Sequence, residues 1–269
     1  MRNAPLRLHN SPQIEILPAS VLRARSNRDA RTLARADWLL RRKSDGQYLA
    51  ARLPDGLMPL VSRLPDEPGL VAALRVLDGI GLRGQLPTAS TLLPLDGLLA
   101  LLQQLALDPQ QYARDSGLAL CAEPAWLELA GRDRWQRPLW LTRRAGQSWL
   151  QMRRAAANDG VSLEAISGYR SHAYQAGIFA RKQARGLSVE QILTVNAAPG
   201  FSEHHSGRAL DIGTPGEPAA EESFEATPAF AWLMAHAGRY GFGLSYPRDN
   251  PHGIVYEPWH WCHQPSATA

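Results

Sequence analysis

An aspartate inside an apolar run constrains this 269-residue chain more than any other sequence feature. Asp211 stands in the run Ala209-Leu210-Asp211-Ile212, directly after residues 197–208 (AAPGFSEHHSGR), which have neither helical nor strand periodicity. This pattern is typical of a Gly- and Ser-rich loop that leads into a short strand. A carboxylate in such a strand is costly unless it is paired or bound to a metal. The fold is therefore expected to bring a partner or a metal ion to Asp211.

Histidines are concentrated in the same part of the chain. Seven of the eight lie at or beyond residue 172, where an even spread would place about three. Imidazole is the commonest metal ligand in proteins, so this distribution points to where chemistry takes place. The two cysteines, Cys121 and Cys262, are too few for a disulfide framework or a four-thiolate zinc site. A metal ion would be held by His, Asp or Glu.

Composition indicates a globular chain, with 45% hydrophobic residues, 20% charged residues and a net charge of +4. The first twenty residues contain no apolar stretch of signal-peptide length, which predicts a cytoplasmic protein, or a periplasmic one if a signal had been removed. No window approaches 18 apolar residues, so no membrane span is expected. Residues 1–60 carry 11 basic and 5 acidic side chains, but no aromatic residue precedes Trp38. Nucleic acid is therefore not an expected partner.

Two regions are predicted along the chain. Residues 1–119 carry no chemical motif, and a hairpin within residues 36–64 with helices over Leu70–Leu77 and Pro94–Leu107 predicts a mixed α/β accessory module of unknown function. Residues 120–269 are predicted to form an α+β domain, a small antiparallel sheet with flanking helices around a zinc site. Its expected helices cover Thr142–Asn158, two segments that begin after Ser171 and Ser188, and one that begins at Thr227-Pro228. Its expected strands are Val161–Ile166, Ala209–Ile212, Gly243–Tyr246 and Ile254–Trp261.

Three segments of this second region contain the candidate catalytic and metal-binding residues. They are Ser167–Ser171 (SGYRS), Ser202–Asp211 (SEHHSGRALD) and Glu257–Trp261 (EPWHW). A catalytic zinc ion needs three nitrogen or oxygen ligands and one open position for water, and His204, Asp211 and His260 would supply those ligands. Glu257 is the acid nearest to a candidate ligand in the last segment and is the candidate general base.

Taken in order, the three segments resemble the zinc D-alanyl-D-alanine carboxypeptidases of the VanY type and their LD-carboxypeptidase and endolysin relatives. The resemblance rests on SGYRS followed by Gln175, on SxHxxGxAxD and on ExWH, and it covers roughly residues 120–264. It implies zinc held by His204, Asp211 and His260, with Glu257 as the base. The first 120 residues match nothing in the family pattern, and the residues Trp261–Gln264 after ExWH depart from it.

The resemblance also implies roles for residues around the metal. Arg170 would stabilise the oxyanion that forms at the peptide carbonyl. Ser202 and Gln175 would help to hold the terminal carboxylate or the backbone of the substrate. The neighbour of His204, His205, is expected to turn away from the metal, because adjacent residues of an extended chain point to opposite sides.

One geometric prediction follows from the last segment. In a regular strand Glu257 and His260 would face opposite ways, and Pro258 favours an extended conformation at Glu257. Both side chains can reach one metal ion only if the strand bends or ends between them. An irregularity is therefore expected there.

The predicted function is hydrolysis of the terminal D-alanine of peptidoglycan stem peptides or muropeptides, with DD or LD specificity and Zn²⁺ as cofactor. One alternative is a peptidoglycan endopeptidase or endolysin with the basic N-terminal module as a wall anchor. A second is a catalytically silent module in which zinc only stabilises the fold. Glu257 and Arg170 argue against the silent module, because a structural zinc site needs neither.

Overall fold

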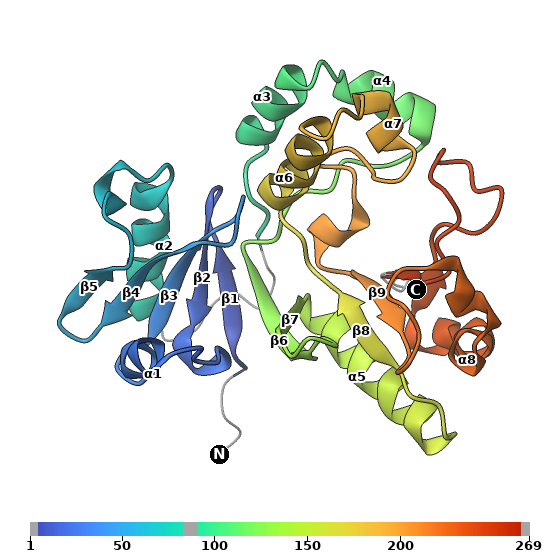
Figure 1. The fold of residues 1–269 in the computed structure, drawn as a ribbon, viewed down its shortest axis with the longest axis horizontal. Helices are drawn as coiled ribbons and strands as arrows, with labels where there is room; N and C mark the ends of the chain where they lie inside the picture. The colour runs from blue at the N-terminus through green and yellow to red at the C-terminus, as the bar shows by residue number, and fades with distance from the viewer. Residues whose placement is uncertain (1–4, 83–90, 265–269) are drawn as a thin grey trace.

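The structure is a computed structural model that describes residues 5–82 and 91–264. A seven-stranded antiparallel sheet with the order β5-β4-β3-β2-β1-β6-β7 forms one side of the molecule (Figure 1). Its strands are β1 (Arg7–Asn10), β2 (Ile14–Pro18), β3 (Trp38–Arg42), β4 (Tyr48–Leu53), β5 (Gly56–Pro59), β6 (Trp126–Arg132) and β7 (Pro138–Leu141).

The predicted hairpin within residues 36–64 is confirmed. Strands β3 and β4 pair antiparallel around a turn in which Gly46 has φ +75°, a left-handed conformation that glycine adopts without a steric cost. Among the described residues, four α-helices belong to this half of the chain, and the predicted helices at residues 70 and 94 correspond to the second and third. They are α1 (Asn27–Leu33), α2 (Leu70–Leu82), α3 (Asp96–Gln104) and α4 (Pro109–Ser116).

A second antiparallel sheet, with the order β10-β11-β9-β8, confirms the predicted α+β class with its small antiparallel sheet and flanking helices. Its strands are β8 (Glu164–Ser167), β9 (Ala209–Gly213), β10 (Phe242–Leu244) and β11 (His260–His263). Helices α5 (Arg143–Asn158) and α8 (Pro228–His236) share a core cluster with this sheet, and α6 (His172–Gln183) and α7 (Val189–Leu193) lie between its strands β8 and β9 in the sequence. Short 3₁₀ helices cover Ala19–Val21, Leu64–Asp66, Glu203–Ser206, Glu222–Ala226 and Ala237–Tyr240.

Helix α5 covers one face of this sheet with an apolar stripe. Trp149, Met152 and Ala156 recur at helical spacing, are fully buried, and share a core cluster with Leu210 and Ile212 of β9. Because successive side chains of a strand alternate between faces, Asp211 projects from the opposite face of β9. The packing of α5 therefore fixes the face of the sheet on which Asp211 is presented.

The strand predicted over Ile254–Trp261 is wrong. Strand β11 begins only at His260, because Pro258 and Trp259 form a turn in which the His260 N–H donates to the Glu257 carbonyl at 3.1 Å. The irregularity expected between Glu257 and His260 is thereby confirmed. It lets two residues three apart in the sequence lie on the same side of the chain.

The seven-stranded sheet crosses residue 120, since β6 pairs with β1 and β7 pairs with β6. The division into 1–119 and 120–269 stays a prediction, and residues 1–4, 83–90 and 265–269 of those ranges lie outside the described part of the chain. Among the helices of the described residues, none has both the length and the apolar character required to span a lipid bilayer.

Candidate metal centre and active site

Three side chains from separate elements meet at one point. His204 comes from the 3₁₀ helix that precedes β9, Asp211 from the middle of β9, and His260 from the first position of β11, directly opposite Asp211 in the strand pairing. All three are buried, and one potential ligand atom of each lies within 4.8 Å of the others. Strand pairing therefore brings Asp211 and His260 together although they are 49 positions apart in the sequence, and with His204 they form a group that can hold a metal ion.

Hydrogen bonds decide which atoms face the centre. The Nδ1–H of His204 donates to the Gly168 carbonyl at 2.7 Å, and its Nε2 lies 3.3 Å from Asp211 Oδ1. The Nε2–H of His260 donates to Glu203 Oε2 at 2.9 Å, and its Nδ1 lies 3.1 Å from the same Asp211 oxygen. Each ring thus has one nitrogen held by an acceptor and the other directed inward. Metal-ligating histidines are typically held in this way.

The electrostatics of the cluster favour a cation. Burial alone would lower the pKa of His260, but the hydrogen bonds and charges of Asp211 and Glu203 raise it to about 10. Burial alone would raise the pKa of Asp211, but its interactions with His204 and His260 hold it well below the usual range. The carboxylates therefore stabilise positive charge between them, and two imidazoles with one carboxylate are a ligand set that suits Zn²⁺.

Glu257 lies beside this cluster. Its Oε2 is 3.8 Å from His260 Nδ1, the nitrogen that faces the centre, because of the turn at Pro258. Burial raises the pKa of Glu257 to about 7, and the charge of His260 opposes that rise. A carboxyl group with a pKa near neutrality is suited to accept a proton and release it again.

Arg170 faces the second carboxylate oxygen of Asp211. Its guanidinium lies 3.8 Å from Asp211 Oδ2 and donates to the side-chain oxygen of Gln175 at 3.0 Å. The Gln175 amide nitrogen donates in turn to the Ala197 carbonyl at 2.9 Å. The Gln175 side chain is therefore held by Ala197 at its nitrogen and orients Arg170 through its oxygen. The predicted substrate-binding role of Gln175 stays a prediction.

A cavity of about 210 Å³ opens onto these groups. Its lining includes all seven residues that the sequence singled out, and it is completed by residues such as Tyr246 and Trp259. The seven are His204, Asp211, His260, Glu257, Arg170, Ser202 and Gln175.

His205 turns away from the centre, as expected, although not for the expected reason. Residues 203–206 form a 3₁₀ helix rather than an extended chain. The Nδ1–H of His205 donates to the Arg170 carbonyl at 2.6 Å, and its Nε2 accepts from the Gly200 N–H at 3.1 Å. His205 therefore supports the backbone on which Arg170 stands.

Glu203 also belongs to this site, although it was not among the residues predicted from the sequence. Burial alone would raise its pKa, but the hydrogen bond and charge of His260 lower it to about 2, so that Glu203 is an ionised acceptor. A metal-ligating histidine requires an acceptor for its second nitrogen. An acidic residue beside a candidate ligand is therefore a signal that was available in the sequence.

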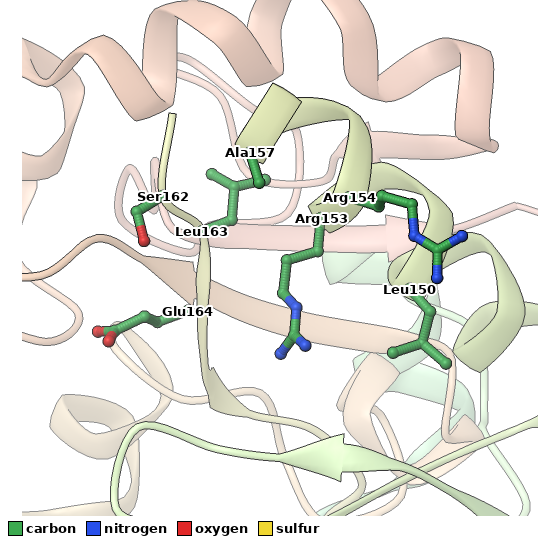
Figure 2. A pocket seen from close by; sticks show the side chains of 7 residues that line it. All are labelled: Leu150, Arg153, Arg154, Ala157, Ser162, Leu163 and Glu164. Atoms are coloured by element: carbon green, nitrogen blue, oxygen red, sulfur yellow. The ribbon is translucent and has the colours of Figure 1, made fainter. Parts of the chain in front are cut away.

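A larger cleft, of about 530 Å³, lies elsewhere on the molecule, between α5 and the segment that leads into β8 (Figure 2). Arg153 and Arg154 of α5 line it together with Glu164. It contains none of the predicted site residues and no cluster of metal ligands among the described residues. The candidate active site is therefore the smaller cavity.

Comparison with known proteins matches the part of the chain that contains this site. Residues 138–266 match the family model of VanY, D-alanyl-D-alanine carboxypeptidase. The resemblance indicated by the three sequence segments is thereby confirmed for this VanY region, residues 138–266. Arg170, His204, Asp211, Glu257 and His260 all lie within it, whereas β1–β6 precede it.

Individual relatives align with the same part of the chain. A D-alanyl-D-alanine carboxypeptidase of Enterococcus faecium is 33% identical over 125 residues, which cover 45% of this chain and 37% of that protein. The chain spans about two fifths of the length of the curated relatives that it matches first. Among solved structures, the LdcB LD-carboxypeptidase shows 32% identity and a TM-score of 0.43, covering 46% of this chain and 59% of that one. A VanY D,D-pentapeptidase variant in complex with Zn(II) shows 30% identity and a TM-score of 0.38, covering 46% and 72%.

Proposed function

We propose that this protein is a zinc-dependent carboxypeptidase that hydrolyses the terminal D-alanine from peptidoglycan stem peptides. One observation carries the proposal: the inward nitrogens of His204 and His260 converge with Asp211 Oδ1 at a cavity that also contains Glu257 and Arg170. Such a set provides metal ligands, a base and a cation in one place. The match of the VanY region and the names of the curated relatives support the choice of substrate.

In this mechanism His204, Asp211 and His260 would hold the metal ion. A bound zinc ion supplies Lewis acidity, which polarises a carbonyl group and lowers the pKa of water towards neutrality. Glu257 accepts a proton from the attacking water and delivers it to the leaving amine. Its raised pKa suits both transfers, because a base that holds its proton too weakly cannot act as the acid in the second step.

Arg170 stabilises the negative charge that develops on the carbonyl oxygen during attack. Its side chain is 17% exposed and its guanidinium is held by Gln175, so the group needs little reorganisation when the charge appears. Donors fixed in advance of the reaction are the most effective form of this stabilisation. Ser202, which is buried and lines the cavity, is proposed to contact the terminal carboxylate of the substrate.

The test is release of D-alanine from purified stem pentapeptides and tetrapeptides, followed by mass spectrometry. We expect release from at least one of them, its loss on treatment with EDTA, and its recovery when zinc is added. The exposed Glu221→Ala variant serves as a control that retains the activity. Cleavage only inside intact sacculi would instead support an endopeptidase, and zinc binding without any cleavage would support the silent module.

A further inference from the structure

We propose that Lys43 and Glu123, which lie outside the VanY region, are positioning residues for Arg170. The inference rests on the proposed function and extends it to the N-terminal half of the chain. Lys43 follows β3 in the turn of the β3–β4 hairpin, and Glu123 precedes β6. Neither residue lies in one of the three sequence segments that contain the candidate catalytic and metal-binding residues.

The two residues form a buried ion pair. The Lys43 Nζ contacts the Glu123 carboxylate, and their side chains are 0% and 3% exposed. Charges buried in this way are costly unless further hydrogen bonds satisfy them. Glu123 also accepts from the Tyr169 hydroxyl and from the backbone N–H of His172, the latter at 2.7 Å. The carboxylate therefore holds residues on both sides of Arg170.

Tyr169 ties the same segment to the seven-stranded sheet. Its ring packs against a cluster that includes Leu8 of β1, Leu17 of β2 and Trp140 of β7. The next residue, Arg170, directs its side chain to the cavity, where it meets Gln175 and Asp211. Anchoring Tyr169 in the sheet thus fixes the backbone from which the Arg170 guanidinium extends.

The hairpin also rests directly on the helix that follows Arg170. A Cβ atom built on Gly177 of α6 would lie 2.9 Å from the Ser44 carbonyl oxygen, so the turn and the helix are in close backbone contact. Helix α6 begins at His172 and carries Gln175. The hairpin therefore contacts α6 directly at Gly177, and through Glu123 it is linked to His172, the residue that begins this helix.

Together these contacts predict a specific kinetic effect. A cation that stabilises only the transition state affects kcat when it is displaced, and leaves KM largely unchanged. We expect replacement of the pair by apolar residues, in Lys43→Met/Glu123→Leu, to lower kcat about 10- to 100-fold. Removing both charges avoids leaving one of them buried without its partner. Lys43→Met/Glu123→Gln, which keeps an acceptor oxygen at residue 123 and leaves neither charge, should restore part of the rate.

The physical part of the proposal is tested by hydrogen exchange. Amides of residues 168–172 are expected to exchange faster in Lys43→Met/Glu123→Leu, while those of β9 keep the wild-type rate. The matched control is Glu67→Gln, which alters another ion pair of the same half of the chain, between Arg42 and Glu67. Unchanged exchange at residues 168–172 would overturn the proposal. This readout does not depend on peptidase activity, so it remains decisive if the wild-type protein does not cleave stem peptides.

A double-mutant cycle tests the link to Arg170. The double substitution should have little further effect on kcat when Arg170 has already been replaced by alanine, because the residue through which it acts is gone. A full additional loss in the Arg170→Ala background would contradict the positioning role and indicate general damage to the fold. The zinc content of each variant, expected to equal that of the wild type, separates this effect from loss of the metal.

Discussion

The Nε2–H of His260 donates to Glu203 Oε2 at 2.9 Å, while the Nδ1 of the same ring lies 3.1 Å from Asp211 Oδ1. Two carboxylates therefore contact opposite nitrogens of one buried imidazole. The outer one fixes the tautomer and the ring plane, which leaves Nδ1 available to a metal ion. Glu203 thus acts on the proposed zinc site through His260.

Replacement of Glu203 by alanine is expected to weaken zinc binding about 10- to 100-fold, the usual range for outer partners of metal-ligating histidines. Competition with a chromophoric zinc chelator measures the affinity directly and requires no substrate. Glu221→Ala, at an exposed position, is the matched control. An unchanged zinc affinity in Glu203→Ala would show that the hydrogen bond does not support the metal site.

Replacement of Arg170 by alanine is expected to lower kcat about 10²- to 10³-fold, as for the loss of an oxyanion donor. KM and zinc content should change little, because the guanidinium acts on charge that develops in the transition state. Steady-state kinetics of D-alanine release provide the measurement, with the exposed Arg239→Ala as control. A rise in KM at constant kcat would instead assign Arg170 to ground-state binding.

The pH dependence of the reaction reports on Glu257. Burial raises its pKa to about 7, and only its deprotonated form accepts a proton from water. Activity is therefore expected to fall as the pH is lowered through this pKa, and the positive charge of a bound metal ion places the midpoint at or below about 7. A profile of kcat/KM against pH locates this limb. A rate that increases as the pH falls below the midpoint would exclude Glu257 as the base.

The Lys43–Glu123 pair also makes a prediction for stability. Lys43→Met leaves the Glu123 carboxylate buried without its cation, which is expected to cost about 3–5 kcal/mol of the free energy of unfolding. The double substitution Lys43→Met/Glu123→Leu should cost much less, because no charge is left alone. Denaturant unfolding measures both, with the chain's other lysine, in Lys182→Met, as control. Equal stability of Lys43→Met and the wild type would contradict the buried pair.

Much of the site was predictable because its signals are local. Asp211 inside an apolar strand required a partner, and alternation along β9 places it on the face opposite Leu210 and Ile212. The turn between Glu257 and His260 followed from the requirement that both reach one metal ion. The structure brings each of these side chains to the same cavity.

The remaining features depend on contacts across long stretches of sequence. Lys43 and Glu123 are 80 residues apart, and neither lies in a motif, so only the pairing of the sheet strands brings them together. The strand predicted over Ile254–Trp261 is wrong because apolar composition does not reveal that His260 bonds back to Glu257. Local sequence patterns predict candidate catalytic residues and secondary-structure elements, but they do not predict which distant residues contact one another.

The most direct test of the proposed function compares the rate of D-alanine release by zinc-loaded Glu257→Gln and by zinc-loaded wild-type protein. We predict that the variant binds zinc as the wild type does and releases D-alanine about 10²- to 10⁴-fold more slowly, because the proton acceptor has been removed. Release at the wild-type rate by zinc-loaded Glu257→Gln would contradict the proposed mechanism.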